Sequence, residues 1–186
     1  RTGSHNARER MDGFKQTIGS NYREADRMAD ETQRTKAQEN VRNAINNHAD
    51  LVALVGIWSY NAPAIVDVVK EKNVAGKYVL VAFDAEPLAV QHMSNGLIDA
   101  MVVQNPYNMG YQSVRLLKAM VEKDESTIKQ MFPGSGANAD IFDTGLKVVV
   151  PDEKSPLKAD SFGNGVQFMP LGEFKQWLAK YNLKGS

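Results

Sequence analysis

The sequence predicts an α/β protein in which helices cover both faces of a parallel sheet. Short runs of consecutive apolar residues recur along the chain, and segments with helical periodicity separate them. An uninterrupted apolar run of this length is typical of a strand that is buried on both faces. Alternation of such strands with helices favours a parallel sheet, because a crossover must connect each strand to its parallel neighbour.

Four apolar runs are the predicted strands, and two connecting helices are expected between the first three. Asn61 followed by Pro63 is typical of a helix N-terminus, because asparagine caps free backbone donors and proline fits the first turn. This helix should run to about Lys72. Pro87 opens the second connecting helix and Gly96 ends it. The strands are Leu51–Ile57, Tyr78–Phe83, Ile98–Val103 and Leu146–Val150.

Apolar residues at helical spacing predict four further helices outside this alternation. The segment Tyr22–Met28 is a candidate short strand, although its composition is polar. Residues 133–140 are predicted to form a loop, and residues 152–168 are predicted to be irregular. The apolar faces of the four helices are Ala7, Met11, Phe14 and Ile18; Ala37, Val41, Ala44 and Ile45; Val114, Leu117 and Val121; and Leu171, Phe174, Leu178 and Tyr181.

Composition narrows the classes of partner. The chain has 186 residues with 22 basic and 22 acidic side chains, and this zero net charge favours neither nucleic acid nor an anionic membrane. Mixed charges in Arg23–Arg42 are typical of a solvated helix face. The absence of cysteine excludes disulfides, thiolate metal sites and cysteine nucleophiles. His5, His48 and His92 lack metal-ligand spacing, so no metal site is expected.

The motifs indicate binding and not catalysis. The sequence contains neither a phosphate-binding glycine loop nor a G-x-S-x-G nucleophile elbow. Carboxylates such as Asp84 and Asp99 could act as acids or bases, but no neighbouring group would activate a nucleophile. We therefore expect no cofactor and no enzymatic activity.

Two polar side chains stand at the carboxyl ends of neighbouring predicted strands. Asp84 follows Phe83 at the end of one strand, and Gln104 ends the next. Ligands of open α/β sheets bind at this edge, so both side chains should face one small polyhydroxylated molecule. Asp84 would accept hydrogen bonds from hydroxyl groups. Gln104 could either donate a hydrogen bond to a hydroxyl or accept one from it. The alternatives are a helix cap for Asp84 and an ordinary polar strand end for Gln104.

Aromatic residues accompany these polar groups. Trp58, Tyr60 and Asn61 follow the Leu51–Ile57 strand, which places them on the same side of the sheet. An aromatic ring can lie against the C–H face of a sugar while its rim stays polar. Core packing is an equal alternative for Trp58, and Phe83 has the same ambiguity.

Four segments carry a resemblance to a known family. They are G-S-H-N-A-R-E-R-M-D-G-F at residues 3–14, V-A-F-D-A at 81–85, N-G-L-I-D-A at 95–100 and Q-N-P-Y-N-M-G at 104–110. In this order and spacing the chain resembles the second lobe of the ribose-type periplasmic sugar-binding proteins, from Gly3 to Val121. The resemblance is weaker over Leu146–Pro151.

The resemblance implies a Rossmann-like parallel sheet and a division of the chain into three parts. Residues 3–104 would form the second sugar-binding lobe. Residues 105–145 would form a crossover helix and loop that pack on the first lobe in the family. Residues 146–186 would form a returning strand and a C-terminal helix. The first lobe would precede Gly3, so we expect this chain to be the C-terminal portion of a two-lobed protein.

The resemblance also implies a function. The chain would belong to the substrate-binding component of an ABC-type sugar importer in the periplasm. Its ligand would be a monosaccharide or related polyol, and its partners the permease and ATPase subunits. Arg10 lies where the family's sugar-binding arginine lies, and a guanidinium can grip two neighbouring hydroxyls. The alternative for Arg10 is a surface ion pair with Glu9 or Asp12.

Two other functional classes agree with the same residues. One is the effector domain of a sugar-responsive bacterial transcription regulator, and the other is a small enzyme on the same sheet.

The expected absence of the first lobe has two consequences. The helix at about Tyr107–Val121 would lack its usual cover, which predicts a homodimer, with Gln104–Asn108 as a hinge for exchanging the helix. One wall of a two-walled site should bind a free sugar no tighter than about millimolar.

Overall fold

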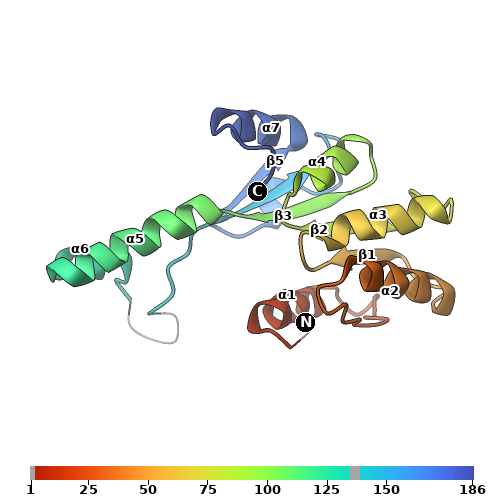
Figure 1. The fold of residues 1–186 in the computed structure, drawn as a ribbon, viewed down its shortest axis with the longest axis horizontal. Helices are drawn as coiled ribbons and strands as arrows, with labels where there is room; N and C mark the ends of the chain where they lie inside the picture. Colours follow the sequence, from red (N-terminus) through yellow and green to blue (C-terminus); the bar gives the residue numbers. More distant parts are fainter. Residues whose placement is uncertain (1–2, 135–138) are drawn as a thin grey trace.

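The computed structural model describes residues 3–134 and 139–186, which form a five-stranded sheet with flanking helices (Figure 1). The strand order across the sheet follows the order along the chain, from β1 to β5. The strands are β1 (Ala53–Gly56), β2 (Val79–Phe83), β3 (Ala100–Gln104), β4 (Leu146–Val150) and β5 (Val166–Pro170). The helices are α1 (His5–Thr17), α2 (Arg34–Asn47), α3 (Asn61–Glu71), α4 (Pro87–Ser94), α5 (Pro106–Glu122), α6 (Glu125–Met131), the 3-10 helix η1 (Ala159–Ser161) and α7 (Leu171–Lys180).

The direction of the strands changes once across the sheet. Strands β1, β2 and β3 are parallel, β4 is antiparallel to β3, and β5 is parallel to β4. The register pairs Gln104 at the end of β3 with Leu146 at the start of β4. The chain therefore re-enters the sheet at the edge where it left, which reverses its direction. The predicted α/β class is confirmed, but the sheet is mostly and not wholly parallel.

Two segments differ from the predictions. Residues 166–168, the end of the segment 152–168 predicted to be irregular, belong to β5 at the edge of the sheet, where a strand needs one partner only and tolerates a terminal proline. Residues 22–28, a candidate strand, have no regular structure. In that segment Arg23 pairs with Asp50, and Arg27 pairs with Asp12, so its polar side chains are engaged in surface ion pairs.

One face of the sheet carries the core, under α3, α4 and α7. Successive strand residues point to opposite faces, and in β1 and β2 burial follows this alternation. Leu54 and Leu80 face the helices and are buried, whereas Val55 and Val81 on the opposite face stay half exposed. From α7, Phe174 is fully buried in the same cluster. This layer fixes the strand ends that carry the polar residues described below.

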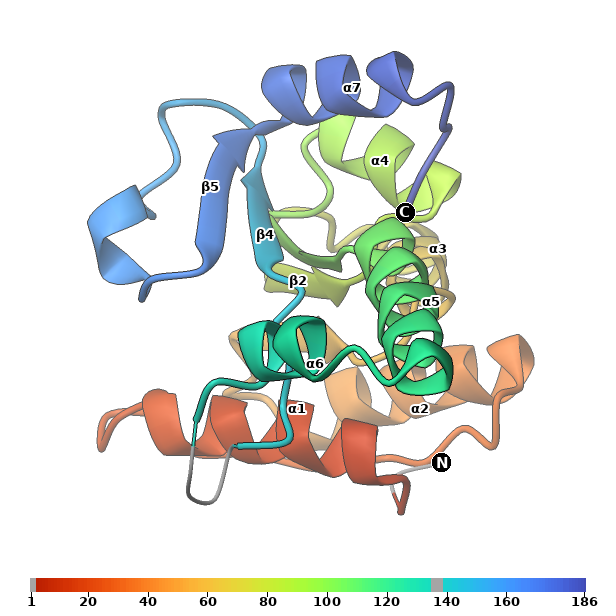
Figure 2. The same ribbon diagram turned by 90° about the vertical axis from the view of Figure 1, so that its left-hand side faces the viewer.

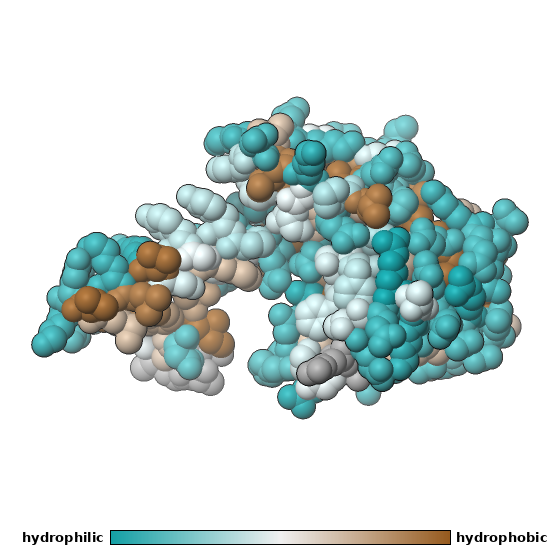
Figure 3. Space-filling view, in the orientation of Figure 1, coloured by the Kyte–Doolittle hydropathy of each residue, from teal (hydrophilic) through white to brown (hydrophobic). Residues whose placement is uncertain are grey.

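Helices α5 and α6 form an arm that projects from the sheet (Figures 1 and 2). Ala119 and Met131 are the buried residues of this arm. Apolar side chains gather on its surface in Figure 3. None of the helices within residues 3–134 and 139–186 combines the length and apolar character that a membrane span requires. The large exposed apolar residues of α5 are Tyr107, Tyr111, Val114, Leu117, Met120 and Val121.

The core layer makes a direct prediction about stability. Replacing Phe174 with alanine should lower the free energy of unfolding by about 3–5 kcal/mol, because a fully buried ring leaves a cavity. Tyr22→Ala, which truncates an exposed ring, should change it by less than about 0.5 kcal/mol. Urea unfolding followed by circular dichroism measures both. Equal losses in the two variants would contradict this assignment of the core.

Candidate functional site

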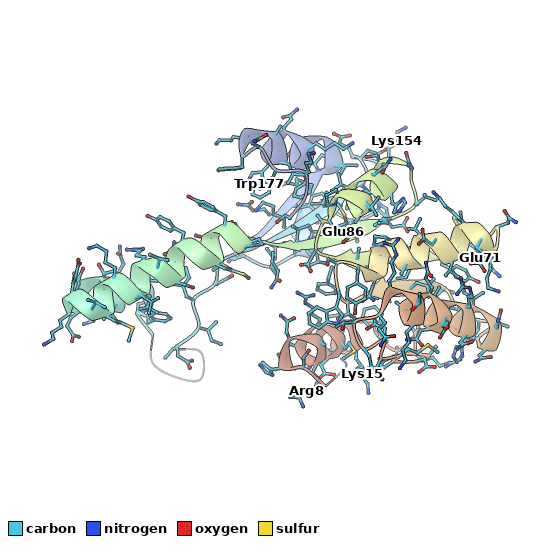
Figure 4. The ribbon with its side chains drawn as sticks, in the orientation of Figure 1. Arg8, Lys15, Glu71, Glu86, Lys154 and Trp177 are labelled. Atoms are coloured by element: carbon cyan, nitrogen blue, oxygen red, sulfur yellow. The ribbon has the colours of Figure 1, made fainter. Side chains whose placement is uncertain are left out.

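Arg10 is brought to the sheet by the amphipathic helix α1. Ser4 begins this helix, and its hydroxyl accepts a hydrogen bond from the backbone N–H of Ala7 (3.3 Å). Ala7 and Met11 are buried, so α1 lies against the body of the protein on that side. The Arg10 side chain is 9% exposed. In contrast, Figure 4 shows Arg8 on the side of α1 that faces away from the sheet.

The Arg10 guanidinium contacts the ends of three strands. It donates hydrogen bonds to the backbone carbonyl of Ile57, just after β1 (2.5 Å), and to Oε1 of Gln104, at the end of β3 (2.9 Å). It also lies over two aromatic rings, 4.6 Å from the centroid of Phe83 and 5.2 Å from that of Trp58. The alternative of a surface pair with a neighbouring carboxylate is therefore wrong.

Asp84 lies beside this cluster without a hydrogen bond to Arg10. Its Oδ1 is 3.9 Å from an Arg10 nitrogen, which is ion-pair distance and beyond hydrogen-bond length. Burial raises the pKa of Asp84, and the charge of Arg10 opposes this only in part. The carboxylate therefore keeps acceptor positions for another donor. The alternative role as a cap is wrong, because α4 begins at Pro87 and no side chain of the described residues caps it.

Asp30 holds the turn after β1. It is 6% exposed, and it accepts hydrogen bonds from the Tyr60 hydroxyl (2.7 Å) and the Asn61 side-chain amide (2.6 Å). The Asn61 carbonyl oxygen in turn accepts from the Trp58 backbone N–H (2.9 Å). The polar groups of Tyr60 and Asn61 are therefore used in hydrogen bonds within this network, which orients Trp58.

Sequence reasoning missed Asp30. The residue lies in the charged segment Arg23–Arg42, which we interpreted as a solvated helix face, but α2 begins only at Arg34. Burial alone raises the pKa of Asp30, yet hydrogen bonds from Tyr60, Asn61 and the Thr32 backbone outweigh it and leave that pKa below its usual range. The signal available in the sequence was only an Asp-Glu pair shortly before a helix.

A groove of about 960 Å³ lies beside the cluster, between α1, α2 and β1. The described residues that line it include Trp58 and Asn61 but not Arg10, Asp84 or Gln104. This groove is therefore separate from the polar side chains of the cluster and adjoins them at Trp58 and Asn61. Within the described residues, no group of three or more histidine, aspartate or glutamate side chains is placed to hold a metal ion.

Comparison with known families classifies this arrangement. Residues 1–125 match the family described as "Periplasmic binding protein domain". The chain belongs to the periplasmic binding protein family. This confirms the resemblance on which the sequence analysis relied. No curated protein sequence matches the chain.

Solved structures of sugar-binding proteins share the fold. An ABC transporter solute-binding protein from Burkholderia graminis, in complex with D-arabinose, is 23% identical with a TM-score of 0.69; the match covers 85% of this chain and 53% of that one. AraP, an arabinose-binding protein from Geobacillus stearothermophilus, is 22% identical with a TM-score of 0.63, covering 80% and 51%. GanP, a glucose-galactose binding protein from the same organism, is 26% identical with a TM-score of 0.54, covering 69% and 41%. The chain thus spans about half the length of these relatives.

The Asp30 network predicts a pH-dependent loss of stability. Asp30→Asn should destabilise the fold by about 1–3 kcal/mol at pH 7, because one buried donor from Tyr60 or Asn61 loses its acceptor. Since the folded-state pKa of Asp30 is lowered, its ionised form contributes stability that is complete above the unfolded pKa of about 4 and fades as pH falls through the folded value.

The difference between wild type and Asp30→Asn should therefore shrink on acidification from pH 7 to pH 3, as urea unfolding at each pH can show. Substitution of the exposed Asp160 by asparagine serves as the control and should leave stability unchanged at both pH values. A gap that stays constant or widens at pH 3 would rule out the ionised Asp30 as the acceptor.

Proposed function

We propose that this chain forms the second lobe of the sugar-binding component of an ABC-type importer. The observation that carries the proposal is the cluster at the carboxyl ends of β1, β2 and β3. There Arg10 is held by Gln104 and two aromatic rings, and Asp84 lies alongside. Charged and amide groups next to ring faces suit a ligand with hydroxyls on its rim and C–H groups on its faces.

Each side chain would have a distinct part in recognition. Asp84 would accept hydrogen bonds from two sugar hydroxyls, since Arg10 makes no hydrogen bond to its oxygens. Within the described residues Gln104 uses its carbonyl oxygen for Arg10, and its amide N–H₂ group would donate to a sugar oxygen. Trp58 and Phe83 each offer one ring face to Arg10, so the sugar would use the opposite face of a ring. Tyr60 and Asn61 would support the site through Asp30.

The proposed steps after sugar binding depend on the two-lobed architecture of the family. We propose that the sugar closes two lobes around itself and that the closed form is presented to a permease and its ATPase in the periplasm. The family consists of solute-binding proteins, and on this reading the chain binds and releases its ligand unchanged. Residues 3–104 would supply one wall, and residues 105–145 would pack on the first lobe.

Weak sugar binding is the direct test. In NMR titrations of the isotope-labelled 186-residue chain with arabinose, glucose and galactose, we expect a dissociation constant of about millimolar or weaker, because one wall leaves much of the sugar in water. Amide shifts should be largest at Asp84 and Gln104. Arg10→Met should weaken binding at least about tenfold, because the guanidinium also orients Gln104.

Arg8→Met is the matched control, since Arg8 lies on the same helix but faces solvent, and it should bind as the wild type does. The amide spectrum of Arg10→Met must show a folded chain for the comparison to count. Sugar-induced shifts that persist in Arg10→Met, or that map away from β2 and β3, would argue against this site. A micromolar constant would contradict the one-wall interpretation.

We also propose that the exposed face of α5 is an association surface. In a solution of the 186-residue chain alone, a second copy of the chain would cover it around a two-fold axis, with an exchange of the arm through the segment 104–108. Light scattering of the 186-residue chain should give a dimer. Leu117→Glu should give a monomer, whereas Leu157→Glu, also exposed but outside the arm, should leave the dimer intact. A wild-type monomer at high concentration would refute the proposal.

A further inference from the structure

The residues after α7 run back to the candidate site. Helix α7 ends at Lys180, and Asn182 adopts a left-handed conformation (φ 54°) that turns the chain around. The backbone N–H of Leu183 donates to the carbonyl of Leu178 (2.9 Å) and closes this turn. Figures 1 and 2 show the chain returning from α7 to the sheet. We call residues 183–186 the C-terminal tail.

The C-terminal tail is bonded to the loop that carries Asp84. The backbone N–H of Ala85 donates to the carbonyl oxygen of Ser186 (2.7 Å), and the N–H of Ser186 donates to the carbonyl oxygen of Ala85 (2.8 Å). Two reciprocal bonds of this kind form a bridge like that between antiparallel strands. The Ser186 hydroxyl also reaches the backbone carbonyl of Gln104 (3.5 Å). The tail thus spans the ends of β2 and β3.

This bridge depends on a glycine. A β-carbon at Gly185 would lie 2.4 Å from the carbonyl oxygen of Ala85 and 2.9 Å from the backbone nitrogen of Pro87. Both are backbone atoms, which cannot move aside as a flexible side chain can. Any other residue at position 185 must therefore lift the tail away from the loop.

The loop needs support because Asp84 has an unfavourable backbone conformation. Its φ is 64°, in the left-handed region that residues with a β-carbon rarely adopt. Such a conformation persists only where surrounding contacts hold it. On one side the Asp84 N–H donates to the carbonyl of Val102 in β3 (2.8 Å). On the other side the next residue, Ala85, is held by Ser186.

We propose that the C-terminal tail is a strap that positions Asp84 and Gln104 for sugar binding, an inference that rests on the proposed function. The tail bonds to backbone groups of the two strand ends and not to the side chains that would meet the sugar. Its effect is therefore on the population of the binding-competent loop, and apparent affinity falls in proportion to that population.

The test uses Gly185→Ala in the 186-residue chain, with Gly172→Ala in α7 as the control, because a β-carbon at Gly172 meets no atom within 4 Å. Two readouts are needed: amide hydrogen exchange at Ala85, and sugar affinity from the NMR titration. Gly185→Ala should speed exchange at Ala85 at least about tenfold and weaken sugar binding by about tenfold, if the competent loop falls to a tenth of its population. Gly172→Ala should change neither.

Deletion of Ser186 is the second variant. It removes both bonds to Ala85 without introducing a clash, and it should reproduce both effects. Unchanged exchange at Ala85 in both variants would overturn the strap. Faster exchange with unchanged affinity would overturn its positioning role. Failure of the wild type to bind any sugar would instead refute the proposed function, while exchange at Ala85 still decides whether the strap exists.

Discussion

The buried guanidinium of Arg10 joins elements that the chain order keeps far apart. Its two hydrogen bonds span 47 and 94 residues of sequence, to Ile57 and Gln104. A charged group with so little exposure must have its donors satisfied, since an unpaired buried N–H is unfavourable. That requirement fixes α1 against the strand ends. The same requirement constrains the distance between the ends of β1 and β3, because the N–H groups of the planar guanidinium point in fixed directions toward their acceptors.

Arg10 is surrounded by residues that contact it directly and by a second set that holds these in place. Phe83, Trp58 and Gln104 touch Arg10 directly. Behind them, Asp30 holds the turn that carries Trp58, and the bonds of Ala85 hold the loop that carries Asp84. Burial lowers the pKa of Arg10, but Asp84 nearby opposes this effect. A loosely coupled pair of this kind keeps hydrogen-bonding capacity that a tight salt bridge would consume.

The sequence could predict the parts of this arrangement that depend on local pattern. Asp84 and Gln104 end apolar runs, so their common position at one sheet edge followed from the parallel order of β2 and β3. The place of Arg10 followed only from the family resemblance, since its partners are distant in sequence. Nothing local foretold that β4 reverses direction, because that depends on where the arm re-enters the sheet. The burial of Asp30 could not be predicted either, because its partners Tyr60 and Asn61 lie 30 and 31 residues away in the sequence.

The arm also has a mechanical property. Both of its connections to the sheet lie side by side, because Gln104 and Leu146 are paired neighbours. A body attached to the arm can therefore pivot about this double attachment as a lever. Helix α5 has 17 residues, so a rotation of about 10° at its base would move its far end by about 4 Å. Gln104 lies at the base of the arm, so it would move far less in such a rotation than the far end of α5 does.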